Sequence, residues 1–247
     1  MNRFVAWCAV LAITGLVMAC GSSSAAQPAP TASATLTPSP TATASPTATP
    51  APMIQDVLAE RLVIPSLNLD APVQKSETVP YTYTPPAGCP GEFEDTTTVT
   101  VPDSGIATPA DALDGLENKI WIFGHSRFQG TPGLFHGLED LKVGDKVYVD
   151  GVDRTTSQAI TNEQFVVNGI YLADTDSGGS LLNSSGPDDI PARTTLVLQT
   201  SVRERGQGAP WLLDQGKLLA GATNIVKGDL DDPCKYLLLF VTAESSS

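Results

Sequence analysis

Short apolar segments separated by turn-forming residues constrain the fold of this chain more than any other feature. Each segment alternates apolar and polar residues or is continuously apolar, as β-strands are. A helical pattern suits only residues 132–141. Six or more strands with short connections and little helix predict an all-β protein, built as a closed or nearly closed barrel. The strand segments are residues 61–73, 119–126, 143–151, 163–173, 194–200 and 235–243.

The first 19 residues are expected to be a signal peptide rather than part of the fold. Arg3 precedes an apolar run of signal-peptide length. The run ends at Ala19, directly before Cys20, which resembles the signal of a bacterial lipoprotein. We expect cleavage before Cys20 and a lipid on its sulfur, which would anchor the protein to the cell membrane on its extracytoplasmic side. An ordinary secretory signal and an uncleaved anchor are the alternatives.

Residues 20–54 are expected to form a disordered tether that begins at the lipidated Cys20. This stretch is dominated by Ser, Ala, Pro and Thr, and it has no apolar period that a fold could bury. Proline favours extended chain, so about 3 Å per residue gives a reach on the order of 100 Å. Residues 55–247 then form a single domain.

Charge and cysteine content limit the partners. The formal net charge of −13 argues against nucleic acid and against an anionic membrane held by charge alone. Cys89 and Cys234 lie in the expected domain, and an extracytoplasmic disulfide between them is predicted, with two separate thiols as the alternative. Residues 174–179 have little of a calcium-loop pattern, so no metal and no other cofactor are expected.

Four segments, in this order, match a known pattern. The first is IPSLNLDAPV at residues 64–73, and the second is GHS at 124–126 with GLF at 133–135 and GDKV at 144–147. Tyr171 follows VVNGI, and TLVLQT occupies residues 195–200. Over residues 61–243 the chain thereby resembles the sortase family, most nearly its D, E and F classes. The GHS segment resembles the part that carries the family's catalytic histidine, and TLVLQT resembles the strand that leads into its catalytic cysteine.

The resemblance implies an eight-stranded β-barrel with short helices. It also implies an extracytoplasmic transpeptidase, which cuts a sorting peptide of the Leu-Pro-x-Thr-Gly type and joins the acyl group to an amine. Members of the family use a cysteine, a histidine and an arginine. Here His125 corresponds to the histidine, but Ser201 stands where the family has its cysteine.

Serine in this position changes what the site requires. A hydroxyl is far less acidic than a thiol, so Ser201 needs a general base within hydrogen-bond reach. We predict that His125 is this base. No carboxylate that orients it is evident from the sequence, and Asp174, Asp176 and Glu204 are the candidates.

The family arginine has no clear counterpart. Arg203 and Arg205 lie in the loop that follows Ser201 and are candidates to stabilise the oxyanion. Lys217 is a third candidate, because residues 216–222 match the strand on which the family arginine lies.

Three functions remain open from the sequence. The first is a serine-based transpeptidase or peptidase that acts on an extended peptide and passes the acyl group to an amine or to water. The second is an inactive sortase-fold module that binds a sorting-type peptide or surface protein without cutting it. The third is a structural surface lipoprotein. The His125 segment favours the first function, and the missing thiol favours the second.

Overall fold

The computed structural model describes residues 57–90, 94–113, 116, 119–174, 194–204, 206, 208–226 and 230–246. The expected signal peptide, Cys20 and the expected tether lie outside these residues, as do Asp176 and Arg205. Within the described part, no helix is both long and apolar enough to span a membrane.

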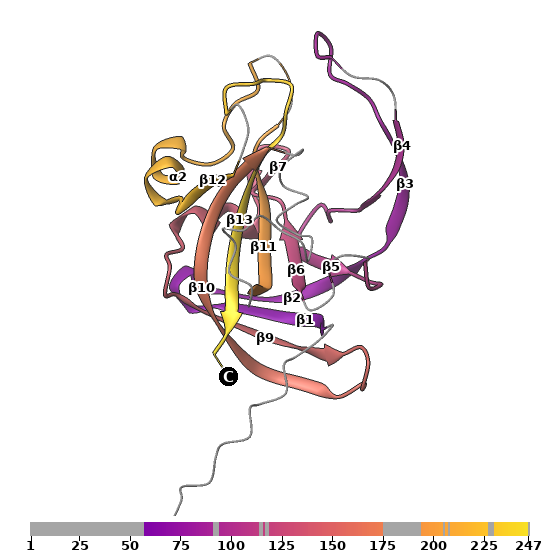
Figure 1. The fold of residues 1–247 in the computed structure, drawn as a ribbon, viewed down its shortest axis with the longest axis vertical. Helices are drawn as coiled ribbons and strands as arrows, with labels where there is room; N and C mark the ends of the chain where they lie inside the picture. Colours follow the sequence, from indigo (N-terminus) through magenta and orange to yellow (C-terminus); the bar gives the residue numbers. More distant parts are fainter. Residues whose placement is uncertain are drawn as a thin grey trace, which may run out of the picture. The chain divides into compact units, whose positions relative to one another are not determined.

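Strands dominate the described residues (Figure 1). Two short 3-10 helices are present, η1 (Pro65–Leu67) and η2 (Leu134–Asp140), together with one short α-helix, α2 (Gln215–Gly221). The strands are β1 (Val57–Ile64), β2 (Leu69–Ser76), β3 (Thr78–Tyr83), β4 (Glu94–Val99), β5 (Ile106–Pro109), β6 (Ile120–Gly124), β7 (Arg127–Phe128), β8 (Thr131–Pro132), β9 (Lys146–Asp153), β10 (Ala159–Asp174), β11 (Thr194–Arg203), β12 (Asn224–Val226) and β13 (Leu237–Ser245).

The main sheet closes on itself. Its order is β12-β10-β13-β11-β6-β5-β2-β1-β9, and β9 pairs again with β10. All of its strands except β12 therefore form a closed barrel of eight strands, and β12 lies beside β10. The prediction of an all-β, closed eight-stranded barrel with short helices is confirmed.

Two local predictions are wrong. Residues 61–73 are not one bent strand: they contribute to β1 and β2, which pair antiparallel on either side of Pro65, where η1 begins. Proline lacks an N–H for the ladder, and Asn68 turns the chain in the left-handed region with φ 50°. Residues 216–222 do not continue a strand, because Asp214 caps the N-terminus of α2 by accepting from the Lys217 N–H.

Alternation along β6 and β11 divides their side chains between two faces. Ile120 and Ile122 of β6 lie in the main core with Leu196 and Leu198 of β11. Val197, on the opposite face, belongs to a second apolar cluster. A strand sends successive side chains to opposite faces, so this pattern determines which face each residue at the strand ends will use.

The strands β3 and β4 form a separate two-stranded ribbon that extends away from the barrel strands (Figure 1). Residues 78–82 of β3 and 95–98 of β4 are exposed to solvent. An isolated two-stranded ribbon is marginally stable in water, so attachments at its ends must hold it in place. Near its base the Ser76 hydroxyl donates to the Thr100 carbonyl at 2.7 Å, and beyond β3 a disulfide joins Cys89 to Cys234.

Candidate active site

The ends of β6 and β11 bring His125 and Ser201 together. The two strands are parallel neighbours, and their last recorded pair is Phe123 with Gln199. Continuing this register by two residues brings His125 opposite Ser201. If the alternation of β6 continues one residue beyond Gly124, both side chains would lie on the same face of the sheet, opposite the face of Leu198 and Ile122.

Two side-chain hydrogen bonds join these strand ends. The Thr200 hydroxyl donates to the Gly124 carbonyl at 2.8 Å, and the Ser126 hydroxyl donates to the Ser201 carbonyl at 2.5 Å. Thr200 and Ser126 are both buried, with 1% of each exposed, so water does not compete for these bonds. Ser126, the residue after His125, thus contacts the backbone of the predicted nucleophile. The described residues contain no hydrogen bond between the His125 ring and the Ser201 hydroxyl.

The environment of His125 favours the neutral imidazole. The ring is half-buried and lies 5.0 Å from the Phe128 ring, centroid to centroid. Burial lowers the pKa of His125, and the charges of Asp103 and Glu204 oppose this shift without cancelling it. A neutral imidazole is the form that can accept a proton at neutral pH.

The carboxylates near His125 differ in part from those that the sequence proposes. Glu204 does act on the charge of the ring, and so does Asp103, which the sequence reasoning missed. Asp103 precedes β5, and only the pairing of β5 with β6 brings that region near His125. Asp174 is 2% exposed and accepts from the Lys235 ammonium at 2.9 Å. Asp174 is therefore engaged in a buried ion pair with Lys235.

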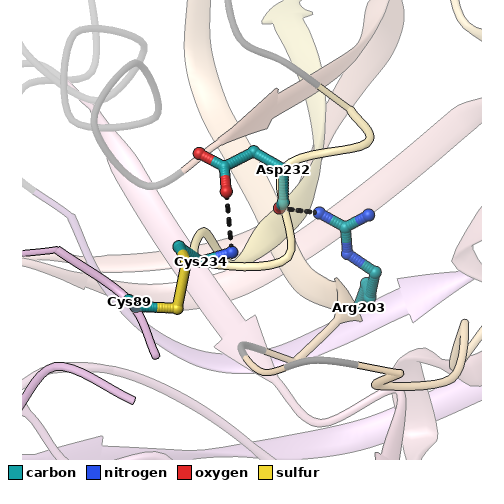
Figure 2. Close-up of a disulfide and its surroundings, with 4 residues drawn as sticks. All are labelled: Cys89, Arg203, Asp232 and Cys234. Atoms are coloured by element: carbon teal, nitrogen blue, oxygen red, sulfur yellow. Dashed lines mark hydrogen bonds between the residues drawn. A yellow bond between two sulfur atoms is a disulfide. The ribbon is translucent and has the colours of Figure 1, made fainter. Parts of the chain in front are cut away.

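Arg203 is bound to the loop that precedes β13. Its guanidinium donates to the Leu230 carbonyl at 2.5 Å. It also donates to the Asp232 carbonyl at 2.5 Å (Figure 2). The guanidinium carbon also lies 5.9 Å from the centre of the Trp211 ring, and Arg203 is only 7% exposed. In this conformation two of its donor nitrogens are used by the protein itself.

Lys217, the third candidate for the role of the arginine, lies on α2 rather than on a strand. Its ammonium forms an ion pair with Asp140 at 2.9 Å and lies 3.8 Å from Glu139. The long strand that follows the Ser201 loop is β13, which pairs with β11. The nearest basic residue before β13 is Lys235.

The disulfide connects the exposed ribbon to this same loop. Cys89 and Cys234 are joined with an S–S distance of 2.09 Å and a Cα–Cα distance of 5.3 Å, which is the pair that the sequence proposes. The Asp232 carboxylate accepts from the Cys234 N–H at 2.8 Å (Figure 2). The Gly206 N–H donates to the Pro233 carbonyl at 2.7 Å. Residues 230–234 therefore contact the ribbon on one side and the chain after Ser201 on the other.

A groove of about 690 Å³ opens beside the ends of β6 and β11. His136 lines it and is half-buried rather than an exposed helix residue, and its Nδ1 is buried without a hydrogen-bond partner in the described part of the chain. No group of three or more potential metal ligands occurs among the described residues. The groove is lined by Arg127, Gln129, Gly130, His136, Glu139, Glu204, Pro210, Trp211, Leu212, Leu213 and Asp214.

No protein-family model matches the chain, and no curated protein matches its sequence. Solved structures that are similar to it include sortase C1 from Streptococcus agalactiae, with 15% identity over 76% of this chain and 67% of that chain, at a TM-score of 0.34. The SrtA sortase from Actinomyces oris is 16% identical over 77% and 81% of the two chains, at 0.34. Sortase E1 from Streptomyces coelicolor, solved with a tripeptide in its active site, is 13% identical over 77% and 91%, at 0.36.

Proposed function

We propose that this protein is a sortase-like peptide acyl transferase in which Ser201 is the nucleophile and His125 is the general base. The observation that carries the proposal is the parallel register of β6 and β11, which brings these two residues to neighbouring strand ends on one face. The substrate is an extended peptide of the sorting type, and the acceptor is an amine or water.

The chemistry follows from the two residues. The Ser201 hydroxyl oxygen attacks the carbonyl carbon of the scissile amide while His125 takes the hydroxyl proton. His125 then gives this proton to the departing amine, which leaves an acyl ester on Ser201. An acceptor amine attacks the ester, its proton passes to His125 and then back to the Ser201 oxygen, and the new amide is released. The lowered pKa of His125 supports its role as a base.

Stabilisation of the oxyanion is assigned to an arginine that follows Ser201. Arg203 is the last residue of β11 and does not lie in a loop as the sequence suggested, but it and Arg205 remain the candidates for this role, and one such donor contributes about 3–4 kcal/mol. Arg203 would have to exchange the Leu230 and Asp232 carbonyls for the substrate oxygen.

We place this activity outside the cytoplasm, on a domain anchored to the membrane by lipid on Cys20. The tether of residues 20–54 would let the domain reach into the cell wall. The residues of the signal sequence support this location.

A second function is favoured by one observation at Arg203. Because two donors of its guanidinium are engaged and no carboxylate is hydrogen-bonded to His125 in the described residues, the site matches a module that binds a peptide without cutting it. Such a module would need the groove and the strand ends but not a reactive serine.

Intact-mass spectrometry separates the two functions. We would incubate the mature chain, and its Ser201→Ala and Ser201→Cys variants, with a library of sorting-type peptides and an amine. An acyl adduct on the wild-type chain that is lost in Ser201→Ala supports the transferase. An adduct on Ser201→Cys alone would exclude the serine transferase and support the binding module.

A further inference from the structure

Three segments of the chain near the site line the groove beside the strand ends. Arg127, Gln129 and Gly130 come from the β7–β8 hairpin, and His136 and Glu139 come from η2. The third wall is Glu204 together with residues 210–214. Arg127 follows His125 by two residues, and Glu204 follows Ser201 by three. Neither His125 nor Ser201 lines the groove, so a ligand in it would bind beside the segments that follow these two residues.

Negative charge prevails in the lining. Glu139, Glu204 and Asp214 are carboxylates, whereas Arg127 is the one Lys or Arg among the lining residues. The Arg127 guanidinium already donates to the Leu212 carbonyl at 3.0 Å and to the Gly130 carbonyl at 3.3 Å. An anionic ligand would have to compete with these bonds and with three carboxylates. A cationic ligand would meet a complementary field.

The three carboxylates of the lining differ in how many hydrogen bonds and ion pairs they form within the protein. The Glu139 side chain is 8% exposed and accepts from the Asp214 N–H at 2.7 Å, and Asp214 accepts from the Lys217 N–H at 3.0 Å. Glu204 is exposed and has neither an ion pair nor a hydrogen bond with any described residue. Among the three carboxylates of the lining, Glu204 is therefore the one that no other described residue engages.

One further lining group suits a cation. The half-buried Trp211 indole offers an aromatic surface in the lining, and it already lies 5.9 Å from the Arg203 guanidinium. An apolar wall of Pro210, Leu212 and Leu213 would cover the aliphatic stem of a long side chain.

We propose that this groove binds a Lys or Arg side chain of the peptide ligand, with Glu204 as the carboxylate that pairs with it. The inference rests on the proposed peptide site and adds a charge requirement to it. It applies whether Ser201 reacts or only the binding function is correct.

The first test measures the cation directly. We would titrate the isotope-labelled mature chain with capped lysine amide, capped arginine amide and capped norleucine amide, and follow the NMR signals of Gly130 and of the Trp211 indole. We expect lysine and arginine to bind about fivefold more tightly than norleucine, which has a similar stem without the charge. The difference should shrink at high salt. Equal binding of all three, or no shift at Gly130 and Trp211, would overturn the proposal.

Matched variants assign the effect to Glu204. Glu204→Gln is expected to bring lysine binding down to the norleucine level, whereas Glu60→Gln, at an exposed carboxylate on β1 outside the groove, should leave it unchanged. Equal weakening in both variants would mean that only the overall negative charge matters.

Norleucine amide with a free amino terminus is a further control ligand, because it carries its positive charge on the backbone rather than on the side chain. If it binds as well as capped lysine, the groove recognises a terminal amine and the side-chain proposal fails.

The proposal that the groove binds a cationic side chain and the proposal of acyl transfer can be tested separately. Selective lysine binding in Ser201→Ala, with no acyl adduct on the wild-type chain, would retain the groove and reject acyl transfer. Acyl adducts that form equally well from lysine-containing and norleucine-containing sorting peptides would retain acyl transfer and reject the groove.

Discussion

The guanidinium of Arg203 donates to the backbone carbonyl of Asp232 at 2.5 Å, two residues before the disulfide-bonded Cys234 (Figure 2). A charged side chain at the end of β11 is thereby bound to the loop that holds the exposed ribbon. Because Arg203 follows Ser201 by two residues, this hydrogen bond links the loop and the disulfide-bonded ribbon to the strand that carries the proposed nucleophile.

Arg203→Ala is expected to lower the free energy of unfolding by about 2 kcal/mol, because two carbonyls lose a charged donor. Urea denaturation measures the loss. Arg61→Ala is the control, since Arg61 forms its ion pairs with Asp70 and Asp150 at an exposed surface and should matter less. An equal loss in the two variants would show that the contacts of Arg203 with the loop contribute no more than a surface pair.

Replacement of both Cys89 and Cys234 by serine is expected to destabilise the protein by about 2–5 kcal/mol. The disulfide closes a loop between residues 145 apart in the sequence, so it restricts the unfolded chain strongly. We also expect faster hydrogen exchange in β3, β4 and residues 230–236, with barrel strands such as β10 still protected. Uniform loss of protection over the barrel would contradict the local role of this bond.

Gly133→Ala is expected to destabilise the site segment by about 1–3 kcal/mol. A Cβ at Gly133 would lie 2.1 Å from the His125 carbonyl oxygen, which real structures do not tolerate without a shift of backbone. Gly137→Ala in η2 is the matched control, because its Cβ would meet only Leu67 at 4.0 Å. Thermal unfolding of both variants checks the difference, and similar midpoints would count against the close packing at His125.

Protonation of His125 is expected to lower stability and activity together on the acid side. Its folded-state pKa lies below its ordinary value of about 6.5, because burial disfavours the charged ring. The folded protein therefore binds the proton at His125 less readily than the unfolded chain does. The stability that the neutral ring contributes is present above the ordinary pKa and is lost as the pH falls through the folded-state pKa. NMR titration of the ring measures the shift.

The same titration tests Glu204. Its charge raises the pKa of His125 in opposition to burial, so Glu204→Gln should lower that pKa further. The Glu60→Gln variant should leave it where it is. An unchanged pKa in Glu204→Gln would mean that the two side chains do not interact.

Much of the fold could be predicted because local patterns record burial. The alternation in residues 194–200 and the apolar run in 235–243 correspond to β11 and β13, which pair antiparallel. The resemblance failed at residues 216–222, which it matched to a strand. The cap at Asp214 and the burial of Leu218 make most of this segment a helix.

The candidate site was predictable only in part. A short pattern at a strand end is a local feature, so the sequence could propose His125 and Ser201, and their catalytic roles stay a prediction. The partners of Arg203 and Asp174 were not predictable, because Leu230, Asp232 and Lys235 are distant in sequence and no local pattern encodes those contacts. Asp103 was missed for the same reason.

By itself the sequence determined the strand-rich composition of the domain, the serine at position 201, and the two domain cysteines. The tertiary structure alone decided that β6 and β11 are parallel neighbours, that Arg203 binds the loop next to Cys234, and that Glu204 lines a groove with Glu139 and Asp214. The physical reason is that periodicity reports which face of a strand is buried, whereas the neighbour of each strand depends on contacts between residues far apart in the chain.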